Sequence, residues 1–250
     1  MPLPKIDTPI YSLKLPSDKK QTVTYRPFLV KEEKILLTAM EGARELKGQA
    51  FQSAVRDVIL RIITNCTDGK IEVNKLPAFD IDFLFLNIRA KSRGEEIEPS
   101  FTCNQEKDGV PCGQVDKYPI RIDEIKIDFP DKDYSKIMIT DHIGLQLKYM
   151  STEEMKVHDS EEDGIEKMFK VIVDSVDYVF DDENVYKGKE TSKAEMVTFV
   201  ENLHEKAFDE IKEFFNHQPR LRHVIDYTCS RCGHKEPVTL EGLEDFFGFA

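Results

Sequence analysis

The feature that most constrains this 250-residue chain is a pair of matching cysteine motifs, one near the middle and one near the C-terminus. Residues 227–233 read YTCSRCG, and residues 101–103 (FTC) with 112–113 (CG) repeat the same order of aromatic residue, threonine, cysteine, cysteine and glycine. A Cys-x-x-Cys-Gly turn lets two thiolates reach one metal ion, and its glycine permits the backbone conformation after the second ligand. Each motif supplies two ligands, whereas a closed structural zinc site needs four.

We therefore predict one structural zinc ion per chain, bound by Cys103, Cys112, Cys229 and Cys232. Lys-Tyr-Pro-Ile follows the first motif as Lys-Glu-Pro-Val follows the second, so each motif is expected to be a strand, a knuckle and a return strand. Two such hairpins that face each other form a zinc ribbon, here split by an insertion of about 115 residues. Eight residues separate the first two cysteines, against the usual two to four, and we expect this polar stretch, 104–111, to bulge outward as a loop.

Two other interpretations of these cysteines stay open. One is a set of reduced, metal-free thiols near a turn, and the other is a redox pair. Redox motifs usually lie at a helix N-terminus, where the dipole lowers the thiol pKa, whereas Pro237 and a short strand follow here. His223 and His234 are alternative ligands, but four thiolates already fill the shell. Four protein ligands leave no coordination position for water, so we predict neither a catalytic zinc nor any catalytic or further cofactor-binding residue.

Composition and charge weigh against several classes of protein. The chain is 40% hydrophobic and 33% charged, which is ordinary for a globular protein. No window approaches the roughly 18 apolar residues that span a bilayer, and the N-terminal MPLPK lacks a secretion signal, so we expect a cytoplasmic protein. A net charge of −12 disfavours binding to nucleic acid or to anionic membranes. Five cysteines do not suit a secreted disulfide framework, and Cys66 is expected to be a buried or half-buried free thiol.

Hydrophobic periodicity predicts an α+β fold in three parts. Residues 1–96 are expected to form a β-hairpin and a small bundle of three helices. Residues 97–126 and 221–250 together form the split zinc ribbon. Residues 127–220 form an insertion with a pair of strands and an acidic helical region over 151–218. Within that region, Ser192 and Glu195 fit a capping box that is expected to begin one long helix running toward His217.

The individual elements can be placed approximately. The hairpin strands are expected at 11–15 and 22–25, the three helices at about 31–46, 51–66 and 80–91, and the inserted strands around 137–139 and 145–149. Asp80 and Asp82 could bind a cation, but acids are favoured in the first turn of any helix. The C-terminal FFGF, residues 246–249, is either an exposed anchor for a partner or part of the packing against the ribbon. The usual nucleotide-binding, metalloprotease and serine-hydrolase motifs are absent from the sequence.

Several of these features occur in a recognisable order. YRPF at 25–28 leads into KEEKILL at 31–37, and a helix ending at Cys66 and a second one running to Arg89 follow. The first cysteine unit and the terminal Cys-x-x-Cys-Gly unit, with its two closing phenylalanines, come next. In this order the chain resembles the baseplate hub proteins of T-even-type contractile-tailed bacteriophages over nearly its whole length. The segment 26–37 and the terminal knuckle are the most specific parts of the resemblance.

The resemblance implies a late structural or assembly protein that acts in baseplate hub formation through contacts with other hub or tail proteins. Some members are hub subunits, and others are chaperones or catalysts of hub assembly, in which catalysis means promoting assembly rather than bond chemistry. The resemblance implies no catalytic residue, so we expect that the protein is not an enzyme. The resemblance also places the protein in the host cytoplasm during assembly and, for a hub subunit, in the virion tail baseplate. We expect the acidic region 151–218 to be longer than in compact members.

Two other functions remain as alternatives. One is a zinc-ribbon accessory module of a nucleic-acid-processing complex, which the charge of −12 disfavours. The other is a metalloenzyme, which requires an open coordination position on the zinc. The sequence predicts neither the direct partner, the oligomeric state nor the surface that binds.

Overall fold

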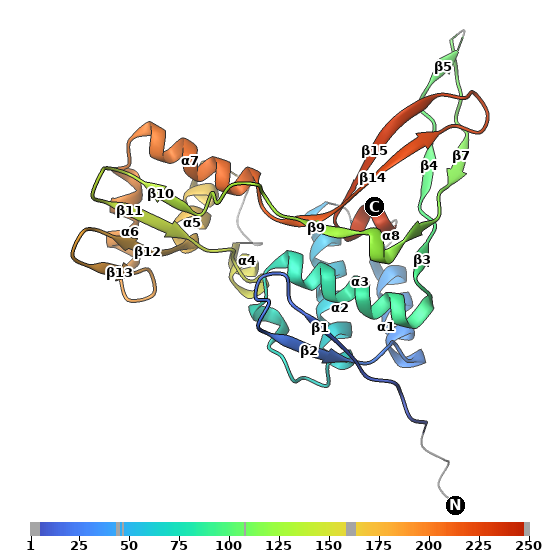
Figure 1. Cartoon of the computed structure of the whole chain (residues 1–250), viewed down its shortest axis with the longest axis horizontal. Coiled ribbons are helices and arrows are strands. Elements are labelled where there is room, and N and C mark those ends of the chain that lie inside the picture. Colours follow the sequence, from blue (N-terminus) through green and yellow to red (C-terminus); the bar gives the residue numbers. More distant parts are fainter. Residues whose placement is uncertain (1–5, 44–45, 47, 108, 159–163, 248–250) are drawn as a thin grey trace, which may run out of the picture. The chain divides into compact units, whose positions relative to one another are not determined.

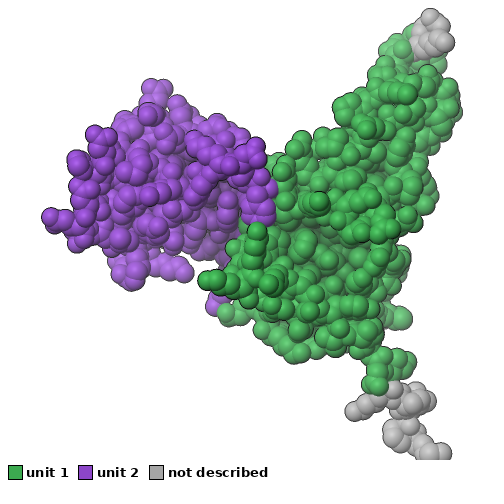
Figure 2. Space-filling model, viewed as in Figure 1, with its two compact units in different colours: residues 1–73, 79–128, 220–250 green, residues 74–78, 129–219 purple. Residues whose placement is uncertain are grey.

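The computed structural model describes residues 6–43, 46, 48–107, 109–158 and 164–247. Contacts within the chain divide it into two compact units (Figure 2). Unit 1 contains residues 1–73, 79–128 and 220–250, and unit 2 contains residues 74–78 and 129–219. The described residues form eight α-helices and several small antiparallel sheets, with an N-terminal hairpin and a cluster of four cysteines (Figure 1). The predicted α+β class is confirmed.

Unit 1 is built from an N-terminal hairpin, helices and the paired strands that follow them. Its helices are α1 (Val30–Ala43), α2 (Gln49–Cys66), α3 (Ala78–Arg93, whose first residue belongs to unit 2) and α8 (Gly242–Phe247). Its strands are β1 (Tyr11–Lys14), β2 (Thr22–Tyr25), β3 (Glu96–Ile97), β4 (Ser100–Thr102), β5 (Glu106–Lys107), β6 (Val110–Pro111), β7 (Val115–Lys117), β8 (Ile120–Arg121), β9 (Lys126–Asp128), β14 (Arg220–Thr228) and β15 (Lys235–Glu241). Short 3₁₀ turns lie at Val73–Lys75, whose first residue belongs to unit 1 and whose other two belong to unit 2, and at Ile122–Glu124.

The N-terminal hairpin and the three helices after it follow the hydrophobic pattern. Strands β1 and β2 pair antiparallel from Tyr11↔Tyr25 to Lys14↔Thr22, and alternate residues of β2 are buried. Helix α2 ends at Cys66 because Asp68 and Gly69 both adopt positive φ angles, 53° and 67°, which turn the chain out of the helix. The predicted hairpin and the three predicted helices are confirmed, and Cys66 is a buried free thiol.

A buried ion pair joins the hairpin to the helices. The carboxylate of Glu32 in α1 is fully buried and accepts hydrogen bonds from both terminal nitrogens of Arg26, at 3.0 and 3.2 Å. It also accepts from the backbone N–H of Leu29 at 2.9 Å, which holds the first turn of α1. Arg26 donates in turn to the carbonyl oxygen of Asn65, near the end of α2, at 3.0 Å. One pair of side chains therefore links β2, α1 and α2.

The two acids at the start of α3 do not share a site. Asp80 is fully buried and accepts hydrogen bonds from the backbone N–H of Ser17, at 3.0 Å, and from the Ser17 hydroxyl. Asp82 lies instead near Glu244 of α8. Its burial, and then the charge of Glu244, raises the pKa of Asp82 to about 7.

Replacing Asp82 with asparagine is expected to stabilise the protein above neutral pH. Because an unfolded aspartate has a pKa of about 3.9, the folded chain binds the extra proton, and its stability falls as pH rises from about 4 to 7. Asp82→Asn removes this pH-dependent loss of stability. The free energy of unfolding of the variant should therefore exceed that of the wild type by up to about 4 kcal/mol at pH 8, and the two values should be equal near pH 4. Urea unfolding at both pH values measures the difference. Glu98→Gln, at an exposed position, serves as the control, and an equal gain at both pH values would contradict the pH argument.

Unit 2 packs helices against a sheet of four strands. The sheet order is β10 (Lys136–Met138), β11 (Gly144–Leu147), β12 (Val176–Phe180) and β13 (Val185–Lys187), all antiparallel. The helices are α4 (Thr152–His158), α5 (Ile165–Ser175), α6 (Lys193–Glu201) and α7 (Glu205–Asn216). Their apolar faces bury a core of their own, which includes Leu145, Ile172, Val200, Ile211 and Phe214. Unit 2 therefore has the hydrophobic interior of an independent domain.

The expectation of a helical region over 151–218 was wrong at 176–180 and 185–187, which are strands. Residues 176–180, VDYVF, are rich in β-branched and aromatic side chains and continue the sheet, with Val179 opposite Leu145. Because these side chains pack into the sheet, residues 176–180 form a strand although helix α5 immediately precedes them. Residues 159–163 of the expected helical region lie outside the described residues.

The capping box is confirmed, but the long helix after it was wrong. The Ser192 hydroxyl accepts from the N–H of Glu195, and the Glu195 carboxylate accepts from the N–H of Ser192, both at 3.3 Å. The helix then ends at Glu201, and α7 begins anew because Nδ1 of His204 accepts from the N–H of Ala207 at 3.1 Å. A histidine in the N-cap position thus divides the expected single helix into two.

The C-terminal aromatic residues of α8 pack inside unit 1. Phe246 is buried, and Phe247 makes an edge-to-face contact with Phe85 of α3, with ring centroids 5.9 Å apart. The guanidinium carbon of Arg89 lies 5.3 Å from the centroid of the Phe247 ring. This arrangement matches a packing role for these two residues rather than an exposed anchor. Gly248 and Phe249 lie outside the described residues.

Among the helices of the described ranges, none combines the length and the apolar character that crossing a bilayer requires.

Candidate metal centre

The four predicted ligand residues meet in unit 1. Their sulfur atoms all lie within 4.8 Å of one another, and the Sγ–Sγ distance is 3.7 Å both for Cys103 with Cys232 and for Cys112 with Cys229. Cys103 and Cys229 are buried, Cys112 is half-buried and Cys232 is exposed. In the part of the chain that the structure describes, this is the one group of three or more histidine, cysteine or acidic residues close enough to share a metal ion. The four cysteines could therefore bind a metal ion.

The two knuckles have the same backbone geometry. In the second, the N–H of Gly233 donates to the carbonyl of Cys229 at 3.0 Å, and the N–H of Cys229 donates to the carbonyl of His234 at 2.9 Å. In the first, Gly113 donates to the Cys103 carbonyl at 3.1 Å, and Cys103 donates to the Gln114 carbonyl at 2.8 Å. Both glycines have positive φ angles, 59° and 72°, which explains why glycine follows the second cysteine in each motif.

A small hairpin accounts for the long spacing in the first motif. Strands β5 and β6 pair between the two cysteines, and the N–H of Cys112 donates to the carbonyl of Gln105 at 2.7 Å. The expected loop at 104–111 is therefore largely a β-hairpin that extends beyond the knuckle, as β5 shows in Figure 1. It takes the place of Ser230 and Arg231 in the second motif and leaves the positions of the flanking cysteines equivalent.

Aromatic residues form a small core beside the sulfur cluster. Phe101 from β4, Tyr118 and Tyr227 from β14 surround one another, with ring centroids 5.7 to 6.1 Å apart. Tyr227 is almost completely buried against Cys103 and Cys229. Because these rings come from both halves of the ribbon, they hold distant chain segments together without a metal ion.

Hydrogen bonds across the two halves add to this core. The Asp116 carboxylate of β7 accepts from the Tyr227 hydroxyl at 3.0 Å, from the Ser230 N–H at 3.1 Å and from the Ser230 hydroxyl at 2.5 Å. The Tyr118 hydroxyl accepts from the N–H of Thr228 at 2.8 Å and donates to its carbonyl at 3.1 Å. These bonds position the second knuckle against the first hairpin.

The hydrogen bonds also set the acidity of the groups around the cluster. The Ser230 hydroxyl, helped by the Ser230 N–H, Gln114 and Tyr227, holds the pKa of Asp116 at about 2. Burial favours the neutral thiol of Cys229, but the N–H groups of Cys232 and Arg231 donate to its sulfur and lower its pKa to about 6. The second knuckle therefore presents a sulfur that is readily ionised, and the thiolate is the form that binds metal.

Replacing Asp116 with asparagine is expected to loosen the second knuckle without removing a cysteine. The amide nitrogen of asparagine cannot accept the bonds that the carboxylate takes from Ser230 and Tyr227. The loss of hydrogen bonds that position metal ligands typically weakens metal binding by about 10- to 100-fold. We expect Asp116→Asn to release bound metal to a chromogenic chelator at least about tenfold faster than the wild type. Asp123→Asn, which removes an exposed partner of Arg121, should leave the rate unchanged, and equal rates in all three proteins would contradict the role of Asp116.

The cysteine motifs identify the four sulfurs, but they do not identify Asp116 or Tyr118. Both residues act across the ribbon, on a segment more than 100 positions later in the chain, and no local pattern marks them. His234 contributes its carbonyl oxygen to the second knuckle, and its ring pairs with Glu236 at 3.5 Å. Neither it nor His223 belongs to the sulfur cluster.

The fold and the site define a two-unit α+β protein whose unit 1 carries a cluster of four cysteines from two knuckles. The sequence model of the family described as T4 bacteriophage base plate protein matches residues 8–248. The chain therefore belongs to the T4 bacteriophage base plate protein family. A search of curated proteins gave no match, and neither did a search of solved structures.

Proposed function

We propose that this protein is a component of the phage baseplate hub, or a factor that assembles the hub, and that it acts through protein–protein contacts without catalysing bond chemistry. Support comes first from the family match, which covers almost the entire chain and implies contacts with other baseplate or tail proteins. The net charge of −12 also favours a protein partner over a nucleic acid. The protein would work in the host cell during assembly and, as a hub subunit, in the virion tail.

We further propose that Cys103, Cys112, Cys229 and Cys232 bind one structural zinc ion. A tetrahedral zinc with Zn–S bonds of about 2.3 Å separates its sulfur ligands by about 3.8 Å, and two of the sulfur pairs here are 3.7 Å apart. Four cysteines complete a closed shell, which is the pattern of a structural rather than a catalytic site. The zinc would hold residues 97–126 and 221–250 together as a split ribbon.

Deleting the gene from the phage that encodes the protein tests the assembly function. We expect the infected cells to accumulate heads without complete baseplates, and wild-type protein supplied from a plasmid to restore infectious particles. Cys229→Ser supplied in the same way should restore far fewer, whereas Cys66→Ala should restore normal numbers. Normal tails and infectivity after deletion would contradict a baseplate role.

Quantitative mass spectrometry of purified virions separates the two forms of the proposal. A fixed number of copies per tail identifies a hub subunit. Absence from virions, combined with loss of baseplates after deletion, identifies an assembly factor.

A further inference from the structure

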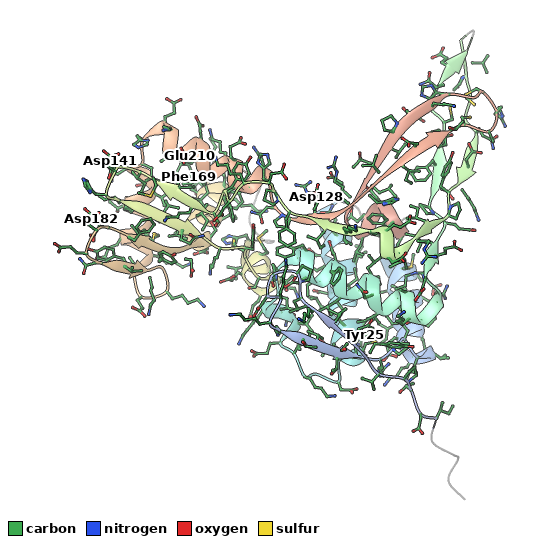
Figure 3. The ribbon with its side chains drawn as sticks, viewed as in Figure 1. Tyr25, Asp128, Asp141, Phe169, Asp182 and Glu210 are labelled. Carbon is green, nitrogen blue, oxygen red and sulfur yellow. The ribbon has the colours of Figure 1, made fainter. Side chains whose placement is uncertain are left out.

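The described residues of unit 2 form an open apolar groove. The groove has a volume of about 660 Å³ and lies among helices α4, α5 and α6. Its walls include Val157, Ile165 and Val197, which are 63%, 73% and 38% exposed, and Phe169, which is labelled in Figure 3. Phe169 also packs against the core of unit 2, whereas Val157, Ile165 and Val197 are not part of that core. A cavity of this size with apolar walls is typical of a binding site.

Three carboxylates, two lysines and one histidine line the groove. Glu166 and Glu201 are exposed on its rim, and Asp174 pairs inside it with Lys193, at 3.1 Å, and with His158, at 3.2 Å. The remaining rim charge, Lys170, is basic. Apolar walls with a pair of exposed acids suit a ligand that has an apolar face flanked by basic side chains.

The net charge of unit 2 also favours a basic partner. Unit 2 contains 22 acidic and 12 basic residues, a formal net charge of −10, so it carries most of the −12 of the chain. Unit 1, with 25 acidic and 23 basic residues, is close to neutral at −2. A second copy of unit 2 would repel this surface, as would a nucleic acid or an anionic membrane. A basic partner would be attracted to it.

We propose that the α4–α5–α6 groove is a docking site for an amphipathic segment of another tail protein, with apolar side chains in the groove and lysine or arginine against Glu166 and Glu201. Such a segment docks as a helix or a short peptide whose spaced apolar residues serve as anchors. This inference deepens the proposed assembly function by naming the surface and the chemistry of the partner. Its test uses purified protein, so a negative binding result stays distinguishable from a phage that assembles normally without the gene.

The probe is a fluorescent peptide of leucine and lysine, about 18 residues or five helical turns long, with its leucines on one face. A second peptide replaces every lysine with glutamine, and a third scrambles the order so that no apolar face forms. Fluorescence anisotropy with the full chain at about 0.1 M salt should show binding of the first peptide at least tenfold tighter than of the other two. Hydrogen exchange should slow in residues 152–158, 165–175 and 193–201 when that peptide is added.

Two pairs of variants locate the binding. Ile165→Asn with Val197→Asn removes apolar wall without changing charge, and Glu166→Gln with Glu201→Gln removes the rim acids. Each pair should weaken binding about tenfold or more, because it removes one of the two complementary features. The control for the apolar pair is Val185→Asn on β13, where Val185 is 61% exposed. The control for the acidic pair is Glu183→Gln with Glu205→Gln, at positions that are exposed elsewhere in unit 2. All substituted positions are exposed, and thermal melting checks that each variant remains folded.

Three results would overturn the proposal. One is equal binding of the leucine–lysine peptide to the groove variants and to the controls, which would identify general charge attraction. Another is tight binding of the glutamine peptide, which would show that basic side chains do not contribute to recognition. The third is a dimer of the wild-type chain in sedimentation that the Ile165→Asn and Val197→Asn changes abolish, which would assign the groove to a second copy.

Discussion

Replacing Cys229 with serine is expected to abolish stoichiometric metal binding and to unfold the ribbon of unit 1. Serine leaves three sulfur ligands, and Cys229 is a buried cysteine whose sulfur accepts hydrogen bonds from the N–H groups of Cys232 and Arg231, which lower its pKa to about 6. Structural zinc sites contribute an apparent 10–16 kcal/mol in small zinc-dependent folds, which is comparable with the whole stability of a domain. The aromatic core and the Asp116 bonds retain some structure, so the loss in the intact protein should be smaller than that figure.

Hydrogen exchange and metal analysis together measure this effect. In Cys229→Ser we expect residues 97–126 and 220–241 to lose protection, while α5, α6 and α7 of unit 2 keep theirs because their core is separate. Cys66→Ala is the matched control, since Cys66 is buried and lies outside the cluster of four cysteines, and this variant should keep its metal. Full metal content and full ribbon protection in Cys229→Ser would show that the sulfur cluster does not stabilise this part of the chain.

Replacing Glu32 with glutamine is expected to destabilise unit 1 by about 3–5 kcal/mol. The substitution leaves the guanidinium of Arg26 buried without its opposite charge, and Arg26 is only 6% exposed. Breaking one side of a buried pair costs more than the pair itself contributes. Chemical denaturation of the two proteins measures the difference in the free energy of unfolding.

The neighbouring residue provides a control for Glu32. Glu33 pairs with Arg93 at the surface, and Glu33→Gln should cost no more than about 1 kcal/mol. The double variant Arg26→Met with Glu32→Leu should recover much of the loss, because it removes both charges and keeps an apolar filling. A cost for Glu32→Gln no larger than that for Glu33→Gln would contradict the importance of the buried pair.

The same pair predicts a loss of stability in acid. Burial alone raises the pKa of Glu32, but the Arg26 guanidinium and the Leu29 N–H outweigh it, so the pKa lies below its usual range. The stabilisation is therefore present above the unfolded pKa, near 4.3, and disappears as pH falls through the lower folded pKa. Glu32→Gln should flatten this acid-dependent part of the stability curve.

Local signals in the sequence predicted the parts of the fold that depend on local chemistry. Cysteine and glycine spacing identified both knuckles because each glycine must take a positive φ angle. The capping box at Ser192 was also predicted, since its bonds join residues only three apart. The hairpin inside 104–111 was missed because its polar residues are equally typical of a loop.

The features that the sequence did not predict depend on tertiary packing. Strands β12 and β13 form because the sheet of unit 2 accepts residues 176–187, and periodicity alone did not separate them from the helices on either side. Asp116 acts on Ser230 and Tyr227 only once β7 lies beside β14. The groove of unit 2 likewise arises from three helices that are not contiguous in the chain.

The measurement that tests the central claim most directly is the metal content of the native protein, purified without added metal, together with the reactivity of its thiols. We expect one zinc per chain, its release when the thiols of Cys103, Cys112, Cys229 and Cys232 are modified, and slow modification of these thiols before denaturation. Protein without metal, whose four ribbon thiols react as fast as those of the unfolded chain, would contradict a structural zinc site.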